Sequence, residues 1–294
     1  MGGDDNAASE PKPTWEERWV LEEGGPGRSG GQGTVQRVTR IADGTVGALK
    51  ELHPSHSHNT ERRYRMQLEA NALKALNGEG VPRILDENRS NFTDTRGGPP
   101  FIIMEWIDGM TLSDRCSGRP MPFDDALRMA DALLNTLERM HRLPVYHRDL
   151  KADNIILQNG DPGRPIIVDL GMAWAGSDGG IDEFRTPDGQ ELGNRSLRLP
   201  EFAPGNPAGR DPRSDIAMLL GVLFFALTGK QPRVLTDERG RKPHEREDIV
   251  PPGITNDPRW QKLRGVFTIG FEPEIENRFQ SVAELRVPVY RLSP

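Results

Sequence analysis

The sequence predicts an α+β fold in which an antiparallel sheet with one long helix is followed by a mainly helical region. Short β-prone runs occupy the first 107 of the 294 residues, where one helical pattern, over residues 60–77, interrupts them. Longer apolar helical patterns come later, over residues 125–142 and 216–227. Strands that precede helices in this way are typical of α+β proteins.

The composition argues against several classes of protein. The 38 Lys and Arg against 44 Asp and Glu give a net charge of −6, which does not indicate a partner such as nucleic acid or an anionic membrane. The single cysteine, Cys116, excludes an internal disulfide and leads us to expect a cytoplasmic protein. No apolar run approaches the roughly 20 residues of a membrane-spanning helix. Residues 1–14 are expected to be a disordered leader.

The first two strands are expected at residues 19–21 and 34–38, on either side of a glycine-rich stretch. Six glycines lie between Gly24 and Gly33, so we expect a hairpin with a glycine-rich turn. Glycine lets the backbone approach a phosphate and direct N–H groups at it. A flexible Gly/Ser linker would have a similar composition, which leaves both interpretations open for this stretch alone.

A possible ion pair links the next strand and the first long helix. The strand at residues 47–52 carries Lys50 on an otherwise apolar face. The helix at residues 60–77 ends at Gly78 and carries Glu69 within its apolar stripe. Because a buried carboxylate needs a partner, we expect Glu69 to pair with Lys50.

The middle and later parts of the chain supply further strands and core helices. Strands are expected at residues 81–86 and 101–107, and the helix at 125–142 has one apolar stripe. Asp215 opens the helix at 216–227, which is apolar on every face. Such a helix is expected to be surrounded by protein.

The most informative stretch is the polar run that begins at His147 and continues into an apolar strand ending at Leu157. It places a carboxylate, an ammonium group and an amide at Asp149, Lys151 and Asn154. These groups are the set required to orient a hydroxyl nucleophile, neutralise a phosphoryl group and hold Mg²⁺. The strand over residues 166–168 then ends in Asp169, which offers a second carboxylate.

Residues 147–154 match the H-R-D-L-x-x-x-N catalytic loop of protein kinases at every fixed position. The chain therefore resembles a eukaryotic-like Ser/Thr protein kinase, and its motifs follow in family order from Trp19 to Leu292. The resemblance implies a bilobal protein kinase fold. Residues 15–107 would form an N-lobe built on an antiparallel sheet with one long helix, and residues 108–294 a mainly helical C-lobe.

The glycine-rich loop and the D-F-G motif of the family are matched with departures. Gly30, Gly33 and Val35 align with G-x-G-x-x-G-x-V, but Arg28 replaces the first glycine. Leu170 replaces the phenylalanine of D-F-G, which changes packing but leaves the carboxylate before it in place.

Later family motifs are also present. Residues 193–201 align with G-T-x-x-Y-x-A-P-E, with Asn194 in place of the threonine that usually bridges the catalytic Asp and Lys. Arg278 corresponds to the arginine that pairs with the Glu of A-P-E, here Glu201. Asp215 would brace the backbone of the turn formed by His147 and Arg148.

The resemblance also implies roles for the catalytic residues. Asp149 would orient the substrate hydroxyl and accept its proton, and Lys151 would neutralise the transferred phosphoryl group and favour Ser/Thr over Tyr acceptors. Lys50, held by Glu69, would position the α- and β-phosphates. Arg148 would pair with a phosphate on the activation segment.

The expected cofactors are ATP and Mg²⁺. Asn154 and Asp169 would hold the metal. The residues expected to bind the nucleotide are Gly30, Gly31, Gly33, Val35, Ala48, Lys50, Met104, Glu105, Ile107 and Ile156.

The expected partner is a protein substrate with a Ser or Thr acceptor, and a regulatory partner or a homodimer for trans-autophosphorylation is possible. We expect neither nucleic acid nor a membrane to be a partner. The candidate phosphoacceptors on the polar segment 169–201 are Ser177, Thr186 and Ser196.

Two alternatives use the same fold. The departures at Arg28, Leu170 and Asn194 fit a pseudokinase that acts as a binding scaffold. A kinase of small molecules normally lacks the arginine of H-R-D and a long activation segment, so Arg148 and residues 169–201 argue against it.

Overall fold

The structure is a computed structural model, and it describes residues 14–22, 28–30, 33–95, 98–171, 174–175, 196–203, 206 and 211–292. The chain divides into two compact units. One contains the residues up to Gln67 together with Ile84–Trp106, and the other contains Leu68–Arg83 together with the residues from Ile107 onward. The predicted succession of an antiparallel sheet with one long helix and a mainly helical region is confirmed.

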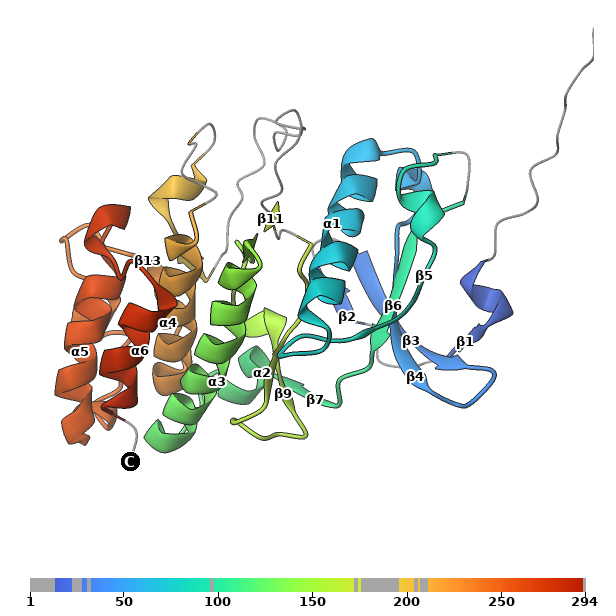
Figure 1. The fold of residues 1–294 in the computed structure, drawn as a ribbon. Coiled ribbons are helices and arrows are strands. Elements are labelled where there is room, and N and C mark those ends of the chain that lie inside the picture. Colours follow the sequence, from blue (N-terminus) through green and yellow to red (C-terminus); the bar gives the residue numbers. More distant parts are fainter. Residues whose placement is uncertain are drawn as a thin grey trace, which may run out of the picture. The chain divides into compact units, whose positions relative to one another are not determined.

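The first unit is built on an antiparallel sheet with the strand order β1-β3-β4-β6-β5, and β2 pairs with β3 beside β1 (Figure 1). The predicted hairpin on the glycine-rich stretch is confirmed, because β1 and β3 pair with Trp19 opposite Arg40. The strands are β1 (Trp19–Leu21), β2 (Arg28–Gly30), β3 (Gly33–Arg40), β4 (Val46–Glu51), β5 (Ile84–Glu87) and β6 (Phe101–Glu105).

An apolar core and one carboxylate stabilise this sheet. Trp19 packs with side chains from β3, β4 and β6 in a buried cluster. Asp86 of β5 accepts hydrogen bonds from Trp19 Nε1 and Arg18 Nε, both at 2.8 Å. Burial tends to raise the pKa of Asp86, but the hydrogen bonds from Arg18 and Trp19 outweigh it and lower that pKa. Asp86 thereby ties the edge strands β1 and β5 of the sheet to each other.

Helix α1 (Thr60–Leu76) follows β4 and contributes residues to both units. It ends one residue earlier than predicted, because Asn77 and Gly78 have φ angles of 45° and 82°, both left-handed. The strand predicted at residues 81–86 was placed too early, since β5 spans Ile84–Glu87. Val81 and Pro82 precede it, and proline lacks the N–H group that a ladder needs.

Arg63 of α1 is a structural residue that the sequence did not predict. Its side chain is buried, and its guanidinium group donates hydrogen bonds to the backbone carbonyls of Ser57, Asn91, Asp94 and Gly98. Arginine has five N–H donors in a fixed fork, so one side chain can satisfy several loop carbonyls. Arg63 thereby fixes the loop between β5 and β6.

The second unit is mainly helical. Its long helices α3, α4, α5 and α6 pack against one another (Figure 1). In α4 every residue from Ser214 to Thr228 is buried, which confirms the prediction of a helix surrounded by protein. The helices are α2 (Leu112–Cys116), α3 (Phe123–Arg142), α4 (Arg213–Thr228), α5 (Pro258–Gly270) and α6 (Val282–Tyr290).

Short strands complete the second unit. The strands β7 (Gly109–Thr111), β9 (Ile155–Gln158) and β10 (Pro165–Ile167) form an antiparallel sheet. The strands β8 (Val145–Tyr146) and β11 (Trp174–Ala175) pair antiparallel, and β12 (Leu197–Arg198) pairs parallel with β13 (Arg233–Val234). None of the helices in the described ranges is both long and apolar enough to cross a membrane.

His244 is buried in the second unit against α5. Its ring stacks on Phe267 and Phe271 at interplanar angles of 27° and 26°, and its Nε2 lies 3.1 Å from Thr268 Oγ1. Burial lowers the pKa of His244 from its usual 6.5 to about 4. The folded protein therefore holds this ring in the neutral form.

We predict that His244 makes the second unit less stable in acid. Below pH 6.5 the unfolded chain binds a proton at this ring and the folded chain does not, until the pH reaches about 4. The free energy of unfolding should fall by up to about 1.4 kcal/mol per pH unit in this interval. Urea unfolding should be measured from pH 7 to pH 4.5. The free energy of unfolding should fall less steeply with pH in His244→Phe than in the parent, and as steeply as in the parent in His58→Phe. An equal slope in His244→Phe would contradict the assignment.

Candidate active site

Residues 147–154 form the loop between β8 and β9, and residues 155–157 lie in β9. The carboxylate of Asp149 lies at the centre of the loop and accepts hydrogen bonds from two neighbours. Lys151 Nζ is 2.6 Å from Asp149 Oδ2, and Asn154 Nδ2 is 3.2 Å from the same oxygen. The structure therefore brings together the carboxylate, ammonium and amide groups that the sequence predicted to act together.

Asp215, at the start of α4, binds the backbone of this loop through hydrogen bonds. Its Oδ2 accepts a hydrogen bond from the backbone N–H of His147 and its Oδ1 one from Arg148, both at 2.8 Å. The predicted brace is confirmed. His141 Nε2 lies 3.2 Å from Asp215 Oδ2, a contact that the sequence did not predict. A histidine in the last turn of a helix ordinarily complements the helix dipole, so its identity alone gave no signal of this contact.

Two residues of the site have left-handed backbone conformations. Arg148 has a φ of 65° and Asp169 a φ of 63°. Such conformations cost a non-glycine residue about 1–3 kcal/mol and persist where the surroundings hold them. For Arg148, the hydrogen bond from its N–H to Asp215 supplies part of that constraint. The strained residues are therefore Arg148, directly before Asp149, and Asp169, the predicted metal ligand.

Asn154 and Asp169 are connected through neighbouring strands. Ile155 pairs with Ile167, and Val168 donates its backbone N–H to the Asn154 carbonyl at 2.8 Å. The Asn154 amide nitrogen donates to the Asp149 backbone carbonyl at 2.9 Å, which turns the amide oxygen away from Asp149. An amide oxygen and a carboxylate are the ligands that Mg²⁺ prefers, so these two residues fit a magnesium site.

The interior behind the loop contains His147 and Leu170, both fully buried. His147 Nδ1 accepts the Asp149 backbone N–H at 3.2 Å, while Nε2 has no hydrogen-bond partner among the described residues. Burial of Leu170 is consistent with an apolar slot for the residue that replaces phenylalanine.

Among the predicted nucleotide-binding residues whose exposure the structure describes, most are buried. Ala48 pairs with Met104 across β4 and β6. Gly30 faces Gly33 in the hairpin of β2 and β3, and Gly31 lies outside the described residues. The remaining predicted residues are buried, as are Ile107 and Ile156, or half-buried, as are Val35 and Glu105.

Lys50 and Glu69 are both buried, with exposed fractions of 6% and 2%. Two charged side chains this deeply buried each require an interaction with an opposite charge or a hydrogen-bonding group. Their mutual ion pair stays a prediction. Asn194, Ser177 and Thr186 lie outside the described residues, and Ser196 is half-buried just before β12.

A buried ion pair joins the segment before α4 to the segment before α6. Arg278 Nη1 and Nη2 donate to the two carboxylate oxygens of Glu201 at 2.6 and 3.1 Å, which confirms the predicted pair. Ser214 Oγ also donates to Glu201, at 2.6 Å, and was not predicted. Both charged side chains are at most 2% exposed, although such residues are usually found at the surface.

Comparisons with known proteins agree with this geometry. The model of the protein kinase domain family matches residues 27–266. Serine/threonine-protein kinase PknB of Mycobacterium tuberculosis is 29% identical over 253 residues, and the match covers 83% of this chain. A probable serine/threonine-protein kinase of Streptomyces coelicolor, SCO3848, is 27% identical over 88% of this chain. The chain spans only 38% of the length of each of these two relatives.

Solved structures show the same fold. The Mycobacterium tuberculosis PknI kinase domain superposes with a TM-score of 0.64 at 19% identity, covering 93% of this chain and 95% of that one. The Rad53 kinase domain superposes with a TM-score of 0.63 at 17% identity, covering 92% of this chain and 87% of that one. The chain therefore has the protein kinase fold and belongs to the protein kinase domain family. The relatives named above are themselves serine/threonine-protein kinases.

We predict that Arg278→Leu destabilises the second unit by about 3–5 kcal/mol, because it leaves the carboxylate of Glu201 buried without its counter-ion. Urea unfolding would measure the loss. The double variant Glu201→Gln with Arg278→Leu removes both charges and should recover much of the stability. A single variant that is no less stable than the double one would contradict this prediction.

Proposed function

We propose that the chain transfers the γ-phosphoryl group of ATP to Ser or Thr hydroxyls of protein substrates. The observation that supports this most directly is the environment of Asp149. Its carboxylate lies between Lys151 and Asn154, on a turn whose backbone Asp215 holds. A fixed carboxylate next to an ammonium group suits an acceptor hydroxyl and an incoming phosphoryl group.

In this proposal each residue of the loop has one task. Asp149 orients the acceptor hydroxyl and takes its proton. Lys151 is held 2.6 Å from that carboxylate, so its ammonium group neutralises phosphoryl charge directly beside the acceptor. Asn154 keeps Asp149 in place through its amide nitrogen and offers its amide oxygen to the metal.

By resemblance to the family, Lys50 would neutralise the α- and β-phosphates of ATP, and Glu69 would hold Lys50. The small side chain of Ala48, opposite Met104 in the sheet, leaves room for an adenine ring. Mg²⁺, held by Asn154 and Asp169, would neutralise phosphate charge.

Arg148 is the residue proposed to bind a phosphate on the chain's own activation segment. That phosphate would be added by a second copy of the chain in a dimer, or its addition would be controlled by a regulatory partner. Its left-handed conformation is fixed by Asp215, so a phosphate pairing with its side chain would act on the residue next to Asp149. Autophosphorylation is the simplest source of that phosphate.

A binding scaffold without transfer is the second candidate, and the departures that favour it are Arg28, Leu170 and Asn194. The arrangement around Asp149 opposes it, because a scaffold does not require a fixed carboxylate beside an ammonium group. A kinase of small molecules is a weaker alternative. Incubation with labelled ATP and Mg²⁺, with and without a panel of sugar and amino-alcohol acceptors, separates the three.

We predict that Asp149→Asn lowers kcat for a generic Ser/Thr protein substrate by about a thousandfold, because an amide cannot accept the hydroxyl proton. Lys50→Met should lower kcat/KM by at least about a hundredfold through loss of phosphate charge neutralisation. Phosphate incorporation measures both effects. Arg119 is an exposed residue of another loop, so Arg119→Glu is the control and should retain parental rates. Parental transfer by Asp149→Asn would exclude the mechanism.

A further inference from the structure

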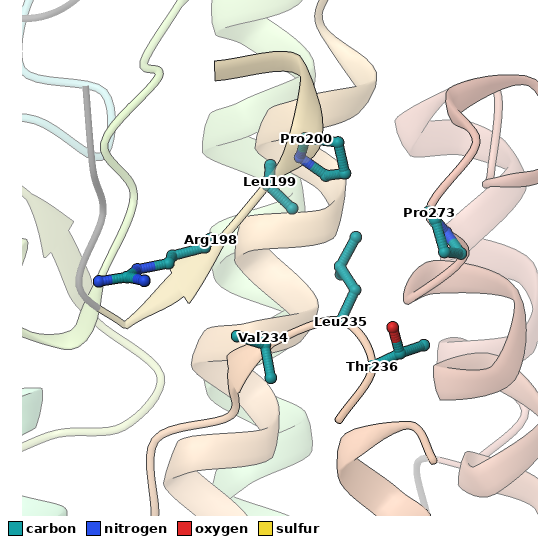
Figure 2. Close-up of a pocket in the computed structure, with 7 residues that line it drawn as sticks. All are labelled: Arg198, Leu199, Pro200, Val234, Leu235, Thr236 and Pro273. Carbon is teal, nitrogen blue, oxygen red and sulfur yellow. The ribbon is translucent and has the colours of Figure 1, made fainter. Parts of the chain in front are cut away.

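A cavity of about 280 Å³ lies in the second unit, and none of its lining residues is assigned to catalysis. Its walls come from the segment around β12, from the residues that follow α4 and from Pro273 (Figure 2). Its volume suits one or two side chains rather than a large cofactor. The lining residues are Arg198, Leu199, Pro200, Val234, Leu235, Thr236 and Pro273.

The cavity has an apolar floor and a basic margin. Figure 2 shows the Arg198 side chain pointing away from Leu235 and Pro273. Arg198 and Arg233 are exposed on the paired strands β12 and β13, and neither has a carboxylate partner among the described residues. The nearby acids Glu201 and Asp237 are already paired with arginines.

The wall that carries Arg233 is rigid. Arg233 has a left-handed φ of 61°, and its backbone N–H donates to the Ser196 carbonyl at 2.7 Å. Beneath it, the guanidinium group of the buried Arg246 donates to the Pro232 carbonyl at 2.5 Å. The backbone of Arg233 is therefore fixed while its side chain stays exposed.

We propose that the cavity and these two arginines dock an acidic, apolar segment of the protein substrate, an inference that rests on the proposed function. A bulky apolar side chain enters the cavity, and acidic residues beside it pair with Arg198 and Arg233. The exposed Glu274 next to Pro273 repels acids, so the acidic part runs over β12 and β13. Docking raises the effective concentration of the acceptor near Asp149.

The test measures binding of a short fluorescein-labelled peptide, with a phenylalanine followed by glutamates, to the full chain without nucleotide. We expect affinity to fall about tenfold or more when the phenylalanine is replaced by alanine or the glutamates by lysines. Val234→Trp, which fills the cavity, and Arg198→Glu with Arg233→Glu should each have a similar effect. Arg119→Glu is the matched control for charge and should bind like the parent. Thermal melts check that each variant folds.

Several results would overturn the inference. Equal affinity for the peptide with lysines excludes this docking mode. Parental affinity in both the cavity-filling and the charge-reversed variants excludes it as well. A concentration-dependent dimer that the same variants abolish would assign the surface to a second copy of the chain. Displacement by a small apolar compound with no peptide binding would assign it to such a ligand.

A parallel assay distinguishes loss of docking from loss of phosphoryl transfer. Phosphate transfer to a short Ser/Thr peptide that lacks the docking segment is measured in parallel. Loss of docking with transfer intact rejects only the docking surface. Peptide binding without any transfer rejects the proposed function and leaves the surface in place.

Discussion

The catalytic loop depends on one buried carboxylate. Asp215 is fully buried, yet its two oxygens accept the backbone N–H groups of His147 and Arg148 and lie next to His141. Hydrogen bonds donated to a carboxylate are stronger than those between neutral groups, and the one from Arg148 holds that residue in a left-handed conformation. The chain direction at Asp149 follows from that conformation. Asp215 therefore sets the position of the Asp149 carboxylate indirectly, through the backbone of Arg148.

Helix α4 gives this brace its rigidity. Because every residue from Ser214 to Thr228 is buried, the helix has no solvent-facing side along which it could shift without disturbing packing. Glu201 is joined to the same helix through Ser214 and to the segment before α6 through Arg278. One buried helix thus anchors both the loop at Asp149 and the segment that carries the basic margin of the docking cavity.

Several contacts of the fold and of the candidate site were predictable from the sequence. Those that were not predicted have physical causes. The contact of Asp215 with the loop and the pair of Glu201 with Arg278 followed from motifs whose residues have fixed partners. The start of β5 did not, because Val81 and Pro82 have the apolar character of a strand without its hydrogen bonding. The burial of Arg63 and the contact of His141 with Asp215 depend on which loops pack nearby, and such tertiary contacts leave no periodic signal in a single sequence.

Asp215 sets the geometry of the catalytic loop through its hydrogen bonds to two backbone N–H groups. The most direct measurement is kcat for phosphoryl transfer by Asp215→Asn, taken together with ATP affinity and thermal stability. In this variant the amide oxygen can still accept one of the two backbone N–H groups, but the amide nitrogen faces the other N–H as a second donor. The loss of that hydrogen bond costs about 1–3 kcal/mol. We expect kcat to fall at least about tenfold, with ATP affinity close to that of the parent. An unchanged kcat in a folded variant would contradict it.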